Sequence, residues 1–283
     1  MTVASLTGAR ARGEHGTGDD TAGGRGGGGG GGLAGAVAAE WTKLWSLRST
    51  WWALAGALGM MALMSVILAS STVSNNTNAL TTDDQGVVSV SGIALGATDL
   101  VQFVVIALAI LVITGEYATG SVRTTLQWVP RRGRMLAAKA AVVAAVVLPA
   151  GMVLAAAGTA VAGPLLGRWG RFSAGEAAGD VLAVGVYLAL ICVFILGVGT
   201  VLRSTAGALT TAFLALMAVP MLLENSTVTA LGYVSDALPS TAGRHFMGGE
   251  AAPYPPAAGL LILAAWTVGS LALGIVVLRR RDA

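Results

Sequence analysis

The chain has 283 residues, of which 55% are hydrophobic and only 11% are charged. Soluble domains carry about a quarter charged residues, so this composition excludes an ordinary soluble globular protein. The formal net charge is +3, and the positions of the basic residues indicate membrane topology instead of nucleic-acid binding.

Residues 1–33 form a polar, glycine-rich start that contains the uninterrupted run Gly26–Gly32. Because such a segment has few apolar side chains to offset its ordering entropy, we predict a disordered cytoplasmic tail. It lacks the apolar core of a cleaved signal peptide, so the first span is expected to act as the insertion signal. A phosphate-binding loop needs a lysine after its glycines, and neither Lys43 nor Lys139 follows one. The sequence therefore predicts no nucleotide site.

Residues 34–50 are predicted to form an amphipathic helix at the membrane interface. A stripe at helical spacing comprises Val37, Trp41, Leu44, Trp45 and Arg48, and the residues off this stripe are Glu40, Lys43 and Ser46. Four of the seven tryptophans lie between positions 41 and 52, as in the aromatic belt of a membrane protein. The helix is either an anchor that fixes depth or a lever that touches a cytoplasmic partner. The residues alone favour the anchor.

Residues 51–283 contain six long apolar runs. Each is close to the roughly 20 residues that a helix needs to cross a bilayer core of about 30 Å. Backbone groups in lipid must satisfy one another, so every run is predicted to be a helix and the fold class is all-α. The predicted spans are Trp51–Ser71, Ala94–Thr114, Ala140–Ala162, Val181–Leu202, Ala206–Leu223 and Ala257–Leu278. The long connection before the last span includes Val228–Leu238, which is apolar enough to form a short broken helix.

The basic residues are distributed unevenly over the predicted connections. If the N-terminus is cytoplasmic, all but three of the 17 basic residues lie on the cytoplasmic side, and the exceptions are Arg168, Arg171 and Arg244. Positive charge is retained on the cytoplasmic side during insertion. We therefore predict a multi-pass protein of the plasma membrane with both termini in the cytoplasm.

The connection between the second and third predicted spans, Gly115–Arg134, combines an acid, a tyrosine, small residues and an arginine cluster. A short helix is predicted from about Ala118 to Trp128, and Pro130 ends it. Such a helix suits force transmission, because a partner that pushes it moves both neighbouring spans. The alternative is a loop that serves only topology through its basic charge.

Ionisable residues are scarce in the predicted spans. Asp99, Lys139 and Glu224 lie near span ends, where their side chains are expected to reach headgroups or water. No acid or base lies in the middle of a span, which disfavours an ion-coupled carrier or a proton relay.

Catalytic motifs are absent from the sequence. It contains neither the His-Glu-x-x-His zinc motif nor the Gly-x-Ser-x-Gly nucleophile elbow. The two histidines, His15 and His245, do not form a credible metal site or triad with the single cysteine, Cys192. Cys192 is predicted to be a small buried hydrophobe. We expect no enzymatic activity and no cofactor in this chain.

Two cytoplasmic motifs resemble the permease subunits of bacterial type-2 ATP-binding cassette exporters. The first is Glu40–Trp52, with the sequence EWTKLWSLRSTWW. The second is Gly115–Arg123, GEYATGSVR, followed by Val129–Arg134, VPRRGR. The six-span layout and the Leu238-Pro239 segment before the last span are similar too. The resemblance covers residues 36–280 and leaves out the glycine-rich start.

In that family an elbow helix precedes the first span, and the first cytoplasmic connection is a coupling helix seated in a groove of a separate ATPase subunit. The resemblance therefore assigns an elbow helix to the segment with Glu40, Trp41, Lys43, Trp45 and Arg48. In the coupling segment, Glu116 and Arg123 are expected to make charged contacts with the ATPase.

The other residues of the coupling segment have roles of their own. The groove of the ATPase is expected to receive Tyr117, Val122 and Leu126. Anionic headgroups are expected to attract Arg131, Arg132 and Arg134. In spans two and five, Phe103 and Phe213 are the candidates for the substrate path.

The resemblance implies a permease subunit that exports a hydrophobic or amphipathic solute, driven by ATP hydrolysis in a separate subunit. Two permeases, identical or different, would form the path with two ATPases. An ion-coupled secondary transporter and a non-transporting membrane scaffold or immunity protein are the alternatives. The sequence does not identify the solute or distinguish export from import.

Overall fold

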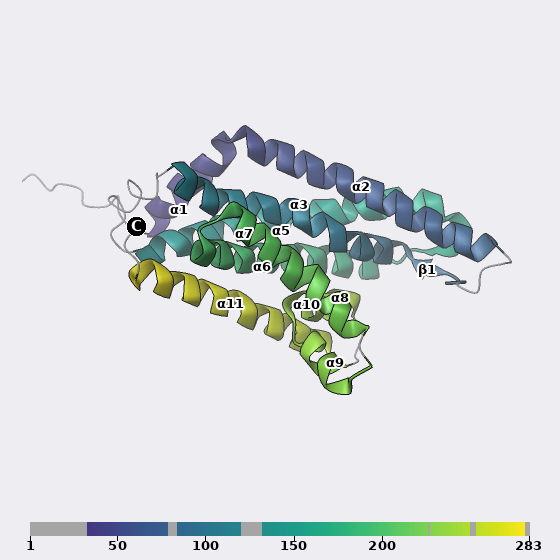
Figure 1. Cartoon of the computed structure of the whole chain (residues 1–283). Coiled ribbons are helices and arrows are strands. Elements are labelled where there is room, and N and C mark those ends of the chain that lie inside the picture. The colour runs from purple at the N-terminus through teal and green to yellow at the C-terminus, as the bar shows by residue number, and fades with distance from the viewer. Residues whose placement is uncertain (1–32, 79–83, 120–131, 226, 250–252, 281–283) are drawn as a thin grey trace, which may run out of the picture. The chain divides into compact units, whose positions relative to one another are not determined.

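The computed structural model describes residues 33–78, 84–119, 132–225, 227–249 and 253–280 (Figure 1). This part of the chain is helical apart from short connections and two two-residue strands, so the all-α prediction is confirmed. Its main helices are α1 (Leu33–Ser46), α2 (Arg48–Thr77), α3 (Val90–Thr119), α5 (Arg132–Leu166), α6 (Ala174–Leu202) and α11 (Pro256–Arg280). Its shorter helices are the 3-10 helix η1 (Gly167–Trp169), α7 (Thr205–Phe213), the π-helix η2 (Leu214–Ala218), α8 (Val219–Glu224), α9 (Thr229–Asp236) and α10 (Pro239–Gly248).

Six helices in the described residues are long and apolar enough to cross a membrane. They coincide with the six predicted spans. The helical segment extends past both ends of the predicted apolar run in five of them, and in the fourth α6 begins earlier and ends at the predicted Leu202. For example, α2 continues to Thr77, because polar residues outside the hydrocarbon can still close backbone hydrogen bonds within a helix. The fifth span is a continuous succession of α7, η2 and α8, with a π turn at Leu214–Ala218 in its middle.

Helix α6 is the central helix, and it packs against α3, α5, α10 and α11. Its buried face includes Tyr187, Leu188, Ile191, Cys192 and Ile195, so Cys192 is the small buried residue that the sequence predicts. At the crossing with α11, a Cβ atom on Gly197 would lie 2.6 Å from the Ser270 hydroxyl. Glycine is therefore required there for the two helices to approach, as is typical of helix packing in membranes.

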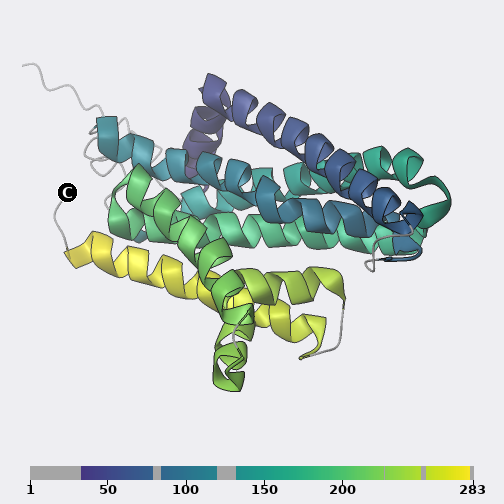
Figure 2. The same cartoon turned by 45° about the vertical axis from the view of Figure 1, so that its right-hand side comes forward.

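The bundle has two ends that differ in their elements. Helix α1, the last turns of α3 and the C-terminal end of α11 lie at one end, here called the α1 end (Figures 1 and 2). The opposite half of the bundle carries α10, and the strand pair lies at its far end (Figure 1). The strands β1 (Val88–Ser89) and β2 (Gly170–Arg171) pair in parallel and tie the start of α3 to the end of α5.

The stretch Val228–Leu238, predicted as a short broken helix, forms α9, and a second helix, α10, follows it after Ala237-Leu238. Leu238 has extended backbone and Pro239 opens α10, a position where the missing N–H of proline costs no helical hydrogen bond. One face of α10 is buried against α6 and α11, whereas Tyr233 and Val234 of α9 are exposed.

Candidate functional site

Helix α1 is joined to the third span by a buried ion pair. The Lys139 ammonium of α5 donates a hydrogen bond to the Glu40 carboxylate of α1 at 2.5 Å. The Lys139 side chain is fully buried, and only 9% of the Glu40 side chain is exposed. Two expectations are therefore wrong: Glu40 does not lie on the polar face of its helix, and Lys139 does not reach headgroups or water. Burial is tolerated because each charge neutralises the other.

Apolar contacts extend this junction along α1. Leu44 is buried against Leu108 of α3 and Val142 and Val146 of α5. Helix α1 ends at Ser46 and α2 begins at Arg48. The Thr50 hydroxyl of α2 donates a hydrogen bond to the Leu44 carbonyl of α1 at 2.7 Å. Helix α1 is thus fixed to α2, α3 and α5 together. Figure 2 shows that α1 turns away from the direction of α2 where that span begins.

The other residues of the predicted elbow helix lie closer to the surface. Trp41 and Arg48 are exposed, and Lys43 and Trp45 are half-buried. The Trp45 ring packs on Trp41, with ring centroids 5.9 Å apart, and on Trp51 of α2, at 5.0 Å. The tryptophans therefore form a connected aromatic row where α1 meets the first span.

Most of the predicted coupling segment lies outside the described residues. This applies to Val122, Arg123, Leu126 and Arg131, and to the side chains of Glu116, Tyr117 and Arg132. The backbone of α3 remains helical to Thr119, so Glu116 and Tyr117 lie in the last turns of α3, past the candidate span Val90–Thr114. Arg134 lies exposed in the first turn of α5.

The structure brings the two predicted substrate-path aromatics together. The Phe103 ring of α3 and the Phe213 ring of α7 have centroids 6.0 Å apart and are tilted by 47°. Phe213 is 49% exposed and directly precedes the π turn. In the same seam the Thr205 hydroxyl donates to the Thr114 hydroxyl at 2.9 Å. The pair forms part of an outward-facing wall, not of an enclosed pocket.

A polar cluster at the opposite end was missed by sequence analysis. The Arg244 guanidinium of α10 donates to the Glu224 carboxylate of α8, and the Thr241 hydroxyl lies 3.5 Å from the same oxygen. Half-buried Asp99 of α3 interacts electrostatically with both charged residues. These residues, except Asp99, line a cavity of about 280 Å³ together with His245.

The signal for this cluster was present in the sequence. Arg244 is one of the three basic residues on the wrong side for the topology rule, and Asp99 and Glu224 are acids at span ends. From the sequence, Asp99 and Glu224 are expected to reach headgroups or water, and Arg244 is only an exception to the charge distribution. Tertiary packing through α10 was needed to bring them together.

A buried hydrogen bond lies between the spans near this cluster. The Tyr187 hydroxyl donates to the Gln102 side-chain oxygen at 2.6 Å, and both residues are buried. Gly243 of α10 packs on the Tyr187 ring so closely that a Cβ atom there would lie 2.2 Å from a ring carbon. Only glycine allows α10 to seat on α6 at this point.

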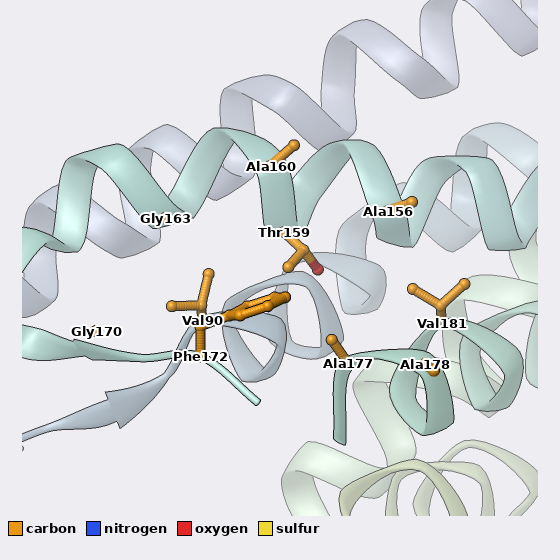
Figure 3. A pocket seen from close by; sticks show the side chains of 10 residues that line it. All are labelled: Val90, Ala156, Thr159, Ala160, Gly163, Gly170, Phe172, Ala177, Ala178 and Val181. Atoms are coloured by element: carbon orange, nitrogen blue, oxygen red, sulfur yellow. The ribbon is translucent and has the colours of Figure 1, made fainter. Parts of the chain in front are cut away.

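Two apolar cavities open on the sides of the bundle. The larger, about 680 Å³, lies between α5 and α6 near the strands. Figure 3 shows Thr159 above Phe172 and Val90, with small side chains such as Ala156 and Ala177 around them. The Thr159 hydroxyl is already donated to the Ala155 carbonyl, so this cavity offers a solute little polar recognition. The second cavity, about 430 Å³, lies between α1, α2 and α5.

In the described residues, no group of three or more His, Cys, Asp or Glu side chains is arranged to hold a metal ion. Six apolar helices packed into one bundle, with apolar side chains exposed on its sides, decide the class of protein. The chain is a polytopic helical membrane protein. No protein-family model matches its sequence, and no curated protein matches it significantly.

Proposed function

We propose that this chain is the membrane-spanning permease subunit of an ATP-binding cassette exporter, and that a separate ATPase subunit hydrolyses the ATP. The solute would be hydrophobic or amphipathic. The motifs at Glu40–Trp52 and Gly115–Arg134 support this assignment through their resemblance to the elbow and coupling segments of that family.

The observation that carries the proposal is the buried Glu40–Lys139 pair. It joins α1 to α5 at Lys139, five residues after the end of the predicted coupling segment Gly115–Arg134, which contains the connection from α3 to α5. Leu44 adds an apolar contact from α1 to both of these spans. A force applied to the connection would therefore move α1, α3 and α5 together, as a coupled transporter requires.

The seam between α3 and α7 supports the position of the solute path. Phe103 and Phe213 present aromatic surface there, and the π turn after Phe213 is a feature that often marks functional sites in helices. A second permease facing this wall would close the path. Its aromatic and aliphatic lining suits a solute with an apolar body.

Co-purification tests the proposed partner. The full chain would be co-expressed with a Walker-type ATPase encoded in the neighbouring reading frame. Arg123→Glu is expected to reduce recovery of the ATPase several-fold, because it reverses a charge in the coupling segment. Arg134→Glu is the matched control, since Arg134 is assigned to headgroups, and it is expected to leave recovery unchanged.

Transport in proteoliposomes tests the activity. The two-subunit complex is expected to move a fluorescent amphipathic dye only when ATP is present on the ATPase side. Dye movement by this chain alone would contradict the proposal, and so would the absence of any ATP-dependent movement by the complex.

An ion-coupled secondary transporter is the second candidate, and the cluster of Asp99, Glu224 and Arg244 favours it, because titratable groups at the end of a span can bind a coupling ion. This candidate predicts that the chain alone transports and that a protonophore stops it. The non-transporting scaffold predicts no movement under either condition.

A further inference from the structure

The cavity between α1, α2 and α5, here called the tryptophan cleft, is lined almost entirely by apolar side chains. Trp41, Trp45 and Trp51 form its rim, and Trp51 is 59% exposed. Indole rings of membrane proteins concentrate at the level of the lipid headgroups. The rim of the cleft therefore marks the membrane surface, and its interior reaches into the hydrocarbon.

The cleft is elongated along the spans. On α2, Trp51, Ala55 and Leu58 recur at helical spacing and all line it. Leu58 lies seven positions after Trp51, which is an advance of about 10 Å along a helix. On α5, Pro149 and Val153 line the cleft one helical turn apart. The tryptophan cleft is therefore a groove that runs from the headgroup level into the bilayer.

Its volume distinguishes an acyl chain from a protein helix. The cleft measures about 430 Å³. A helix about 10 Å wide would occupy roughly 800 Å³ over a length of 10 Å, so it would not fit without large movements. A single hydrocarbon chain is thinner and is the material that surrounds the bundle in a membrane. The shape therefore favours a lipid chain over a second copy of the protein.

The charges around the cleft select the headgroup. Arg48 is exposed and precedes Trp51 by three residues, so it lies on the same face of α2, one turn nearer the α1 end. Helices α1, α2 and α5 contain one acid, Glu40, and Lys139 neutralises it. The local charge is therefore positive. We propose that the tryptophan cleft binds one acyl chain of an anionic phospholipid, whose phosphate contacts Arg48.

Native mass spectrometry of the full chain, released from detergent, tests this site. The probes are phosphatidylglycerol and phosphatidylcholine with identical acyl chains, added in equal amounts. One basic residue near a membrane surface strengthens binding of an anionic lipid roughly fivefold. The unmodified chain is therefore expected to retain one phosphatidylglycerol with a preference of about that size.

Two variants test the headgroup contact and the acyl-chain cleft separately. Arg48→Gln is expected to remove the preference, with Arg280→Gln at the same end of the bundle as the control. Ala150→Leu puts a larger side chain into the cleft and is expected to abolish retention of the lipid. The matched control is Ala265→Leu, on an exposed face of α11 away from the cleft.

Several results would overturn the proposal. Equal retention of both lipids by the unmodified chain would show that the headgroup is not selected. Retention that survives Ala150→Leu would show that the lipid does not bind in the cleft. Loss of a dimer in Ala150→Leu, with lipid binding unchanged, would assign the cleft to a protein interface. Circular dichroism and gel filtration establish that each variant is folded, and a variant that is not folded is replaced by Ala145→Leu, which fills the same cleft.

Discussion

The pair Glu40–Lys139 shows that one side chain can determine which face of its helix is buried. On an isolated α1 the Glu40 side chain belongs with the polar residues, but in the bundle it is covered and paired. Lys139→Met would leave the Glu40 carboxylate buried without a partner, which costs about 3–5 kcal/mol. We expect a clear fall in the apparent melting temperature of the full chain in detergent, measured by differential scanning fluorimetry.

The double variant Glu40→Leu/Lys139→Met tests whether this loss comes from the unpaired charge. Replacing both members of a buried pair with apolar residues of similar volume is often neutral or stabilising. We therefore expect the second substitution to restore most of the lost stability. A double variant as unstable as Lys139→Met would show that the two side chains are not energetically coupled.

At the scale of elements, the seating of α10 on α6 depends on Gly243. A methyl group at this position would overlap the Tyr187 ring, and the hydrogen bond from Tyr187 to Gln102 holds that ring in place. Overpacking of this kind costs about 1–3 kcal/mol. Gly243→Ala is expected to lower the melting temperature, whereas Gly248→Ala, on the same helix with no neighbouring atoms to overlap, is expected to leave it unchanged. Equal effects of the two substitutions would mean that helix propensity, and not the close approach, governs this site.

The sequence predicts the elements of this protein well because span length and apolarity are local properties. The six spans and the helix before them are all present. The short helix predicted within Val228–Leu238 is present as α9. The buried face of α1 was not predictable, because the partner of Glu40 lies 99 residues away. The cluster around Arg244 and the tryptophan cleft were missed for the same reason: each is assembled from several helices.

For the whole molecule, the distribution of charge agrees with one orientation of the bundle. Two of the three basic residues that break the topology rule are paired with carboxylates at the opposite end: Arg171 binds Glu176 at 2.8 Å, and Arg244 binds Glu224. The third, Arg168, stacks on the Trp169 ring at 4.9 Å. The two carboxylates offset the charge of Arg171 and Arg244, so most of the unbalanced positive charge remains at the α1 end. We therefore expect the α1 end to face the cytoplasm.

Cysteine labelling in intact cells measures this orientation directly. The native Cys192 is fully buried, so the unmodified chain is expected to remain unlabelled by a membrane-impermeant maleimide. Two exposed serines provide matched positions, Ser173 at the opposite end and Ser46 at the α1 end. Ser173→Cys is expected to react from outside, and Ser46→Cys only after the membrane is permeabilised. The reverse pattern would invert the orientation. Three spans separate the two positions, and an odd number must place them on different sides of the membrane. Reaction of both cysteine variants from outside would therefore contradict the number of spans.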